Sequence, residues 1–357
     1  MNQKKVAVGM SGGLDSSMVA LLLKNQGYEV VGLTMKFWNN NCKVKGSHSG
    51  CYGPGENKRI EEVNLIAEKL DIPLNIIDLS QEYERDVIDY FKREYENGRT
   101  PNPCIMCNSK VKFGALIDKA REIGIDFDYF ATGHYARISK ENELYLLKKG
   151  IDDTKDQSYF LYKLTQQRLS QIMFPLGEMK KKDVKAIAKD LGLHDLAEKK
   201  ESQNFIQSEE YSSLIDNKTP GNIVNLHGEI IGSHTGIASY TVGQRKINIG
   251  GLSQPYYVIK IDKENNEIVA GPKERAYSQH LEAEDMNWIV PLDKVNEKVE
   301  AKIRYGSTQA RAIIKEKTQE KIILEFESPQ FAITPGQAVV LYNDDIVIGG
   351  GIITKTF

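Results

Sequence analysis

A Gly- and Ser-rich stretch at residues 9–17, GMSGGLDSS, constrains the fold of this chain more than any other feature. A short apolar run precedes it at residues 5–10, and a helical pattern follows it at residues 18–25. Two adjacent glycines let the backbone turn tightly and approach a ligand closely. Backbone N–H groups at the start of a helix attract anions. The stretch therefore predicts a phosphate-binding loop in the first strand–helix unit of an α/β domain.

The rest of the first 200 residues continues this alternation of strand and helix patterns. An alternation of this kind predicts a doubly wound parallel sheet, whose ligands bind beyond the carboxyl ends of the strands. Strands are predicted at 5–10, 29–36, 74–79 and 127–132, and helices at 18–25, 60–70 and 111–123.

After about residue 208 the pattern changes to short strands separated by Gly, Pro and Asn turns. We expect a catalytic α/β domain at 1–207, a small connecting domain at 208–279 and an antiparallel β-barrel or sandwich at 280–357. The predicted strands of the second half are 255–261, 267–270, 299–305, 310–315, 321–326 and 338–342.

The charge balance limits the partners of the protein. The chain has 357 residues, with 47 Lys and Arg against 49 Asp and Glu, so the formal charge is −2. This excludes a uniformly basic nucleic-acid binder but not a local basic patch. No apolar run approaches the roughly 20 residues that span a bilayer, and residues 1–8 lack the apolar segment of a signal peptide. We expect a soluble cytoplasmic protein without membrane contact.

The loop itself suggests how a phosphate is held. Ser11, Ser16 and Ser17 can donate hydroxyl groups to phosphate oxygens. Asp15 is unexpected there, because a carboxylate repels phosphate; it fits if it binds Mg²⁺ or orients a reacting group. The stretch is neither a Walker A sequence nor G-x-G-x-x-G. A strand-to-helix turn without a ligand is the alternative.

Four cysteines occur, Cys42, Cys51, Cys104 and Cys107, and the last two form a C-x-x-C pair. They are too few for a disulfide scaffold in a chain of this size. Their clustering in one third of the chain indicates a metal or redox site.

The loop resembles the pyrophosphate loop of the N-type ATP pyrophosphatases, the PP-loop superfamily. Further segments, in the same order along nearly the whole chain, resemble the tRNA-specific 2-thiouridylase (MnmA) family. They are RTPNPCIMCN at 99–108, ATGHY at 131–135, KDQSYFL at 155–161, YTVGQRK at 240–246 and TPGQ at 334–337.

The resemblance implies ATP-dependent 2-thiolation of the wobble uridine of tRNA. In this family the uridine C2 oxygen attacks the α-phosphate of ATP, and sulfur borne on a cysteine then displaces AMP. ATP and Mg²⁺ are the implied cofactors. The implied partners are tRNA and a sulfur donor such as a cysteine desulfurase or a persulfide carrier.

The resemblance also assigns roles to residues of this sequence. The ATP site is matched by Gly9, Met10, Ser11, Gly12, Gly13, Leu14, Asp15, Ser16, Met35 and Gly133. The target base is matched by Asn102, Pro103 and Cys104, and tRNA contacts by His134, Lys155, Asp156, Gln157, Arg304, Tyr305 and Gln337. Cys107 matches the catalytic cysteine, and Cys104 and Asp15 complete the expected catalytic set.

Several of these residues have simpler interpretations. Met35 fits core packing, His134 a satisfied turn histidine, and Asp156 a cap of the helix that starts near 158. Arg304, Tyr305 and Gln337 fit ordinary strand-surface and turn positions. The run Lys180, Lys181 and Lys182 is typical of a solvated helix face.

The sequence departs from the family pattern at the cysteines. The usual pattern has Asp in place of Cys104 and a second cysteine near 201–207, where this chain reads ESQNFIQ. Cys104 can replace that cysteine, because the start of a helix lowers the pKa of thiols that share its face. Alternatively, Cys104 and Cys107 hold an iron–sulfur cluster with Cys51 or Cys42. A zinc site is a third interpretation, although it lacks the second half-site of a zinc ribbon.

Two other functions remain open on the sequence alone. One is a different PP-loop ATP pyrophosphatase that acts on a small molecule, although no nucleophile for an ammonia-producing domain is visible. The other is a non-catalytic tRNA-binding protein, in which Ser11–Ser16 and Cys107 would have no reason to be intact.

Overall fold

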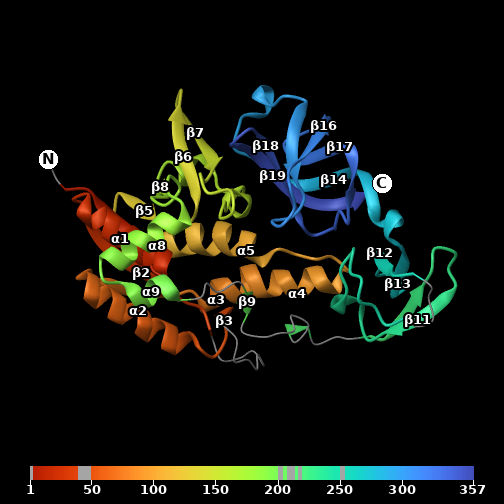
Figure 1. Ribbon diagram of the computed structural model, residues 1–357, viewed down its shortest axis with the longest axis horizontal. Helices are drawn as coiled ribbons and strands as arrows, with labels where there is room; N and C mark the ends of the chain where they lie inside the picture. The colour runs from red at the N-terminus through yellow and green to blue at the C-terminus, as the bar shows by residue number, and fades with distance from the viewer. Residues whose placement is uncertain (1–2, 39–49, 200–203, 207–213, 216–218, 250–253) are drawn as a thin grey trace. The chain divides into compact units, whose positions relative to one another are not determined.

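The computed structural model describes residues 3–38, 50–199, 204–206, 214–215, 219–249 and 254–357. The chain folds into two compact units (Figure 1). The first consists of Met1–Val87, Cys104–Glu209 and Asp345–Val347, and the second of Ile88–Pro103, Glu210–Asp344 and Ile348–Phe357. The division at residues 207 and 279 stays a prediction.

The first unit contains a five-stranded parallel sheet in the order β4-β2-β1-β5-β8. This confirms the predicted doubly wound sheet. The order runs one way from β1 to β4 and the other way from β5 to β8, so the switch point lies between β1 and β5, where ligands of such sheets bind. The strands are β1 (Lys5–Gly9), β2 (Glu29–Lys36), β4 (Leu74–Asp78), β5 (Tyr129–Ala131) and β8 (Ile172–Met173).

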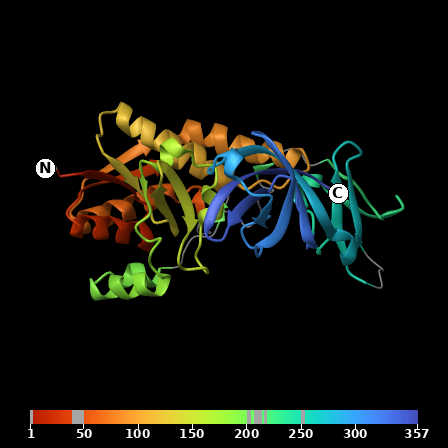
Figure 2. The same cartoon turned by 90° about the horizontal axis from the view of Figure 1, so that it is seen from above.

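Apolar side chains from helices and strands form one core beside the switch point. Met18 and Val19 of α1 pack in the same buried cluster as Val8 of β1, Val63 of α2 and Val184 of α8. This core holds the starts of α1 and α8 near the end of β1. The helices are α1 (Leu14–Asn25), α2 (Glu56–Leu70), α8 (Lys181–Asp190) and α9 (His194–Glu198), and Figure 2 shows them from above.

The predicted helix at 111–123 is more complex in the structure. A short helix, α5 (Pro103–Met106), leads into a π-helix over Cys107–Ala115 and then into α6 (Leu116–Glu122). The Ser109 hydroxyl donates to the carbonyl of Ile105 at 3.0 Å, and such a bond competes with regular helical pairing. Wide turns of this kind are frequent at functional sites, and this one begins at Cys107.

Other elements of the first unit are small. A hairpin absent from the sequence prediction, β6 (Ala136–Glu141) and β7 (Leu144–Lys149), is drawn in yellow in Figure 1. The remaining elements are β3 (Gly50–Tyr52), β9 (Asn204–Ile206), α3 (Ser80–Tyr83), the π-helix Glu84–Ile88, α7 (Gln166–Leu169) and the 3-10 helix Ser158–Leu161.

The second unit holds a closed antiparallel barrel, which decides between the predicted barrel and sandwich. Its strand order is β14-β17-β16-β15-β18-β19, and pairing of β14 with β19 closes it. Leu281, Phe326 and Leu341 lie in its buried core. The strands are β14 (Tyr277–Trp288), β15 (Lys298–Lys302), β16 (Ala310–Lys317), β17 (Lys321–Phe331), β18 (Ala338–Asn343) and β19 (Ile346–Thr356).

A smaller mixed sheet in the order β11-β10-β13-β12 makes up much of the rest of this unit. Ile223, Val258 and Ile268 form its core. Its strands are β10 (Gly221–Val224), β11 (Ile230–His234), β12 (Tyr256–Asp262) and β13 (Glu267–Pro272), and α4 (Asp89–Glu96) also belongs to the unit. Among the described residues of this unit there are also 3-10 helices at Ile237–Ser239, Lys273–Ala276 and Leu292–Lys294.

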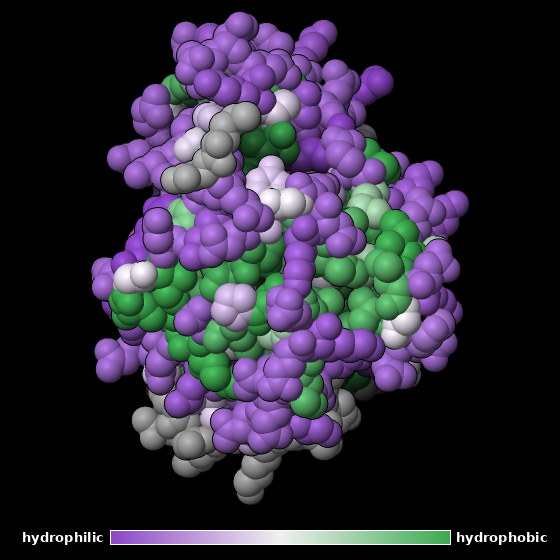
Figure 3. Space-filling model, turned by 90° about the vertical axis from the view of Figure 1, so that its left-hand side faces the viewer, coloured by the Kyte–Doolittle hydropathy of each residue, from purple (hydrophilic) through white to green (hydrophobic). Residues whose placement is uncertain are grey.

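The surface is mixed in character. One face of the molecule gathers apolar side chains across its middle, with polar side chains around them (Figure 3). Leu65, Ile76 and Ile123 are exposed apolar side chains of the first unit. Among the described residues, no helix is long and apolar enough to cross a membrane.

A buried carboxylate fixes the chain where it leaves β2. Glu56, 2% exposed, accepts the backbone N–H of Phe37 at 2.8 Å and that of Trp38 at 3.0 Å. Arg59 lies 3.5 Å from the same carboxylate. The start of α2 is thereby bonded to the end of the strand that carries Met35.

We predict that Glu56→Ala lowers the free energy of unfolding by about 2–4 kcal/mol, since it leaves the N–H groups of Phe37 and Trp38 without their acceptor and Arg59 without its carboxylate partner. Urea unfolding followed by circular dichroism measures the change. Glu61→Ala, an exposed glutamate on the same helix, is the control. Equal stability of the two variants would contradict the role given to Glu56.

Candidate functional site

The loop between β1 and α1 has the shape of an anion cradle. Gly12 has a φ of +79°, in the left-handed region that favours glycine. Gly13 is the N-cap of α1 and provides no side-chain cap. The first N–H groups of a twelve-residue helix therefore meet the loop without a capping side chain. This is the local geometry that the sequence predicted.

The serines divide into two groups. The Ser16 hydroxyl accepts the N–H of Ser11 at 3.1 Å and lies 3.2 Å from the Ser11 hydroxyl, so these two side chains share the inner side of the loop. Ser17 is fully buried and donates to the carbonyl of Gly13 at 2.9 Å. The Ser16 hydroxyl also donates to that carbonyl, at 3.2 Å, but Ser16 in addition bonds Ser11. The expectation that Ser17 donates to phosphate is therefore not supported in this conformation.

Asp15 forms an ion pair that the sequence did not reveal. The Nζ of Lys181 lies 2.8 Å from Oδ1 and 2.7 Å from Oδ2 of Asp15. The Tyr135 hydroxyl donates to the same carboxylate at 3.0 Å. Lys181 is only 7% exposed, whereas Lys180 and Lys182 are exposed. The prediction of a solvated helix face is therefore wrong for Lys181.

Gly133 brings the end of β5 against the loop. A Cβ at this position would lie 2.7 Å from Cβ of Asp15 and 3.1 Å from the N of Ser16, so no larger residue fits without movement. Met35 is at the end of β2, where its carbonyl accepts Nη2 of Arg59 at 2.6 Å. The structure thus places the predicted ATP residues at the carboxyl ends of three adjacent strands.

The segment at 155–157 is tied to the same site. Gln157 and Tyr135 exchange two hydrogen bonds, from Tyr135 N to Oε1 at 3.0 Å and from Gln157 N to Tyr135 O at 2.9 Å. Asp156 is buried and accepts the N–H groups of Gly150 and Ser158, both at 3.1 Å. Its carboxylate thus bonds Ser158, the first residue of the 3-10 helix, but the N-cap of that helix is Gln157, so the capping interpretation is wrong in detail.

His134 is also buried. Its Nδ1 lies 2.7 Å from the Thr132 hydroxyl, and its ring lies beside those of Phe113 and Phe174. Burial, with a smaller contribution from the Lys112 charge, holds the pKa of His134 well below its usual value. The ring is therefore neutral and packed inside, which favours the turn-histidine interpretation.

The cysteines that the structure describes are all free thiols. Cys51 and Cys104 are exposed and Cys107 is partly exposed, while Cys42 lies outside the described residues. Surrounding protein nevertheless raises the pKa of Cys104 to about 12 and that of Cys107 to about 11, in each case chiefly by desolvation. The expectation of a lowered thiol pKa at the start of a helix is therefore wrong.

The three thiols share one neighbourhood. Burial first, and then the charges of Cys107, Cys51 and Cys104, hold the pKa of Tyr83 well above its usual value. Cys51 lies on β3, which pairs in parallel with β9 in the register Gly50 to Asn204 and Tyr52 to Ile206. The part of the chain that the structure describes contains no group of three side chains already placed to hold a metal ion.

Two predicted segments of the second unit are also joined. Gln337 donates from Nε2 to the carbonyl of Thr100 at 2.7 Å and lies 3.3 Å from that of Pro101, directly before Asn102 and Pro103. The Thr100 hydroxyl bonds that of Thr241 at 3.1 Å, which adds the 240–246 segment. Gln337 thus fixes the backbone directly before Asn102 and Pro103, the residues predicted to face the target base.

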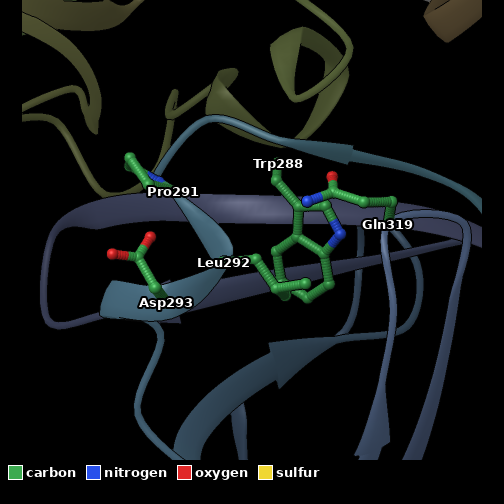
Figure 4. Close-up of a pocket in the computed structure, with 5 residues that line it drawn as sticks. All are labelled: Trp288, Pro291, Leu292, Asp293 and Gln319. Carbon is green, nitrogen blue, oxygen red and sulfur yellow. The ribbon is translucent and has the colours of Figure 1, made fainter.

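Arg304 and Tyr305 follow β15. The Tyr305 side chain is 38% exposed, and the Lys302 ammonium lies 5.4 Å from its ring centre. An open hollow elsewhere in the same unit contains none of the predicted residues. It is lined by Trp288, Pro291, Leu292, Asp293 and Gln319 (Figure 4).

Comparison with known proteins agrees with the order of the segments. Residues 4–208 match the family model described as the tRNA methyl transferase HUP domain. Residues 211–272 match its PRC-barrel domain, and residues 278–353 match the aminomethyltransferase beta-barrel domain.

Relatives match the chain from end to end. A protein of Acetivibrio thermocellus named tRNA-specific 2-thiouridylase MnmA is 45% identical over 99% of this chain and 100% of its own length. MnmA 1 of Clostridium botulinum is also 45% identical, with the same coverage. A solved 4-thiouridine synthetase–RNA complex with bound ATP has a TM-score of 0.36 and 15% identity over 60% of this chain and 46% of its own, too little to carry an argument. Identity of 45% over nearly the whole of both chains shows that this protein belongs to the tRNA-specific 2-thiouridylase (MnmA) family.

Proposed function

We propose that this protein is an ATP-dependent tRNA-uridine 2-sulfurtransferase that makes 2-thiouridine at the wobble position. The observation that carries the proposal is the presence, in one compact unit, of the Gly12–Ser16 anion cradle and the thiols of Cys104 and Cys107. The first serves adenylyl transfer, and the second serves sulfur transfer. A pyrophosphatase that acts on a small molecule needs only the anion cradle, and a non-catalytic tRNA-binding protein needs neither the cradle nor the thiols. We place the activity in the cytoplasm, with a cysteine desulfurase or persulfide carrier as the sulfur donor.

Two displacements account for the reaction. The uridine C2 oxygen forms a bond to the α-phosphorus of ATP, and the bond from that phosphorus to pyrophosphate breaks. A sulfur nucleophile then attacks C2, and the C–O bond breaks as AMP leaves. The N–H groups at the start of α1 and the hydroxyls of Ser11 and Ser16 stabilise the departing pyrophosphate.

Mg²⁺ fits this site chiefly as a companion of ATP. Asp15 is the carboxylate of the loop, and both of its oxygens already bond Lys181. Mg²⁺ commonly keeps substrate phosphates and water as most of its ligands. When bound, the ion neutralises charge on the phosphates, while the loop residues orient them.

We predict that Ser16→Ala abolishes tRNA-dependent release of pyrophosphate from ATP while the fold survives, because the change removes one hydroxyl of the loop and no apolar packing. Asp15→Ala should abolish release as well, although it also leaves Lys181 without its carboxylate partner. Pyrophosphate is measured with ATP and bulk tRNA. Ser17→Ala is the matched control, since it removes a buried hydroxyl one residue away. Unchanged release in the first two variants would remove the central proposal.

For the sulfur step we propose that Cys107 is the catalytic thiol and that Cys104, Cys107 and Cys51 hold an iron–sulfur cluster. Three described cysteines, Cys51, Cys104 and Cys107, belong to one compact unit, and this supports the cluster because a simple dithiol needs only two. The charges of all three thiols act on Tyr83, so Cys51 lies in the same neighbourhood as Cys104 and Cys107, and a cluster would require these side chains to move from the positions described.

We predict that Cys107→Ser, Cys104→Ser and Cys51→Ser each abolish thiolation, and that anaerobically purified wild-type protein is brown with bound iron and sulfide. Nucleoside analysis of tRNA and metal analysis measure the two properties. Iron-free, colourless protein that thiolates tRNA after Cys51→Ser would establish the dithiol alternative. Full activity of the Cys104→Ser variant would exclude both the iron–sulfur cluster and the dithiol.

For tRNA recognition we propose that Lys155, Arg304 and Tyr305 contact RNA directly. The other predicted tRNA residues act on tRNA indirectly. His134 and Asp156 are buried, and Gln157 and Gln337 bond neighbouring backbone. The net charge of −2 means that binding depends on such local groups.

We predict that Arg304→Ala weakens tRNA binding and reduces the slope of log K against log salt by about 1, the loss of one phosphate contact. Filter binding over a salt series measures both quantities. Lys298→Ala, an exposed cation on β15, is the control. A slope identical to that of the wild type after Arg304→Ala would contradict a phosphate contact.

A further inference from the structure

Lys181 is held at the phosphate loop by contacts on both its backbone and its side chain. Its N–H donates to the Asp152 carboxylate at 2.9 Å, which fixes the first residue of α8. Its ammonium bonds both oxygens of Asp15 and lies 5.6 Å from the centre of the Tyr135 ring. A lysine restrained in this way has little freedom to leave the site.

This placement explains why a phosphate loop tolerates Asp15. A bare carboxylate repels phosphate, whereas a carboxylate paired with an ammonium contributes no net charge. Lys181 is 7% exposed, and a charge so buried is retained only with partners of opposite charge. The pair therefore presents an ammonium beside the start of α1, where phosphate oxygens are to lie.

We infer that Lys181 binds a phosphate group of ATP directly and bridges it to Asp15, an inference that rests on the ATP site of the proposed function. An ammonium has three N–H donors, so it can keep one Asp15 oxygen and transfer another donor to a phosphate oxygen. Phosphate carries more negative charge than the carboxylate, which favours this exchange.

The other lysine at the loop is placed differently. Lys199 donates to the carbonyl of Gly12 at 3.0 Å and to Glu62 at 2.7 Å, and its side chain is 44% exposed. Lys199 therefore contacts the loop from its solvent-exposed side. Lys181 is the one that meets the first turn of α1.

The test is a double-mutant cycle on ligand affinity, measured by calorimetry with ATP and with adenosine. Lys181→Met is compared in the wild-type background and in the Asp15→Asn background, and circular dichroism checks the fold of each variant. In both backgrounds we expect Lys181→Met to weaken ATP binding about tenfold or more, the usual effect of losing a charged hydrogen bond. Adenosine affinity should stay unchanged, and Lys182→Met, an exposed neighbour, should bind ATP as the wild type does.

Two results would overturn the inference. Loss of ATP affinity in the wild-type background alone would mean that Lys181 only neutralises Asp15. Equal loss for ATP and adenosine would mean that it only supports the local structure. The experiment uses neither tRNA nor a sulfur donor, so its failure is distinct from failure of the proposed thiolation.

Discussion

The ion pair between Asp15 and Lys181 is the contact on which the first unit's site depends. It joins the first turn of α1 to the first residue of α8, which lies 166 residues further along the chain. The Tyr135 hydroxyl bonds Asp15 and so joins the segment after β5 to the pair. The Asp152 carboxylate accepts the N–H of Lys181 and so joins the loop before residue 155. Removing the Asp15 carboxylate would leave the Lys181 ammonium, whose side chain is 9% exposed, without its anionic partner, so these segments hold their places together.

The local part of this site could be predicted from the sequence, and the long-range part could not. Loop and strand positions follow from consecutive residues and from hydrophobic periodicity, which is why β1, β2 and the glycine turn were predicted closely. Lys181 stands in a run of lysines whose pattern is typical of an exposed helix start. Only the fold of the chain reveals which lysine faces Asp15. The strand β19 was missed for another reason, because Gly349, Gly350 and Gly351 interrupt its apolar pattern.

The cysteines show a second limit of sequence patterns. C-x-x-C before a helical pattern led to an expectation of lowered thiol pKa values, since helix starts stabilise thiolates. In the structure Cys107 begins a π-helix, and desolvation outweighs both that effect and the Lys112 charge. The same side-chain pattern fits either helix type, and burial depends on residues distant in sequence.

The segment predicted to face the target base has a comparable dependence on distant residues. Contacts group Ile88–Pro103 with the second unit, although the sequence division placed it in the catalytic domain. Gln337 bonds the carbonyl of Thr100, and a Cβ on Gly336 would lie 2.8 Å from the N of Thr100. Removing the barrel would therefore also free the residues that precede Asn102. A single substitution such as Arg304→Ala therefore tests the proposed tRNA contact alone, whereas truncation of residues 280–357 would also remove Gln337 and its bond to Thr100.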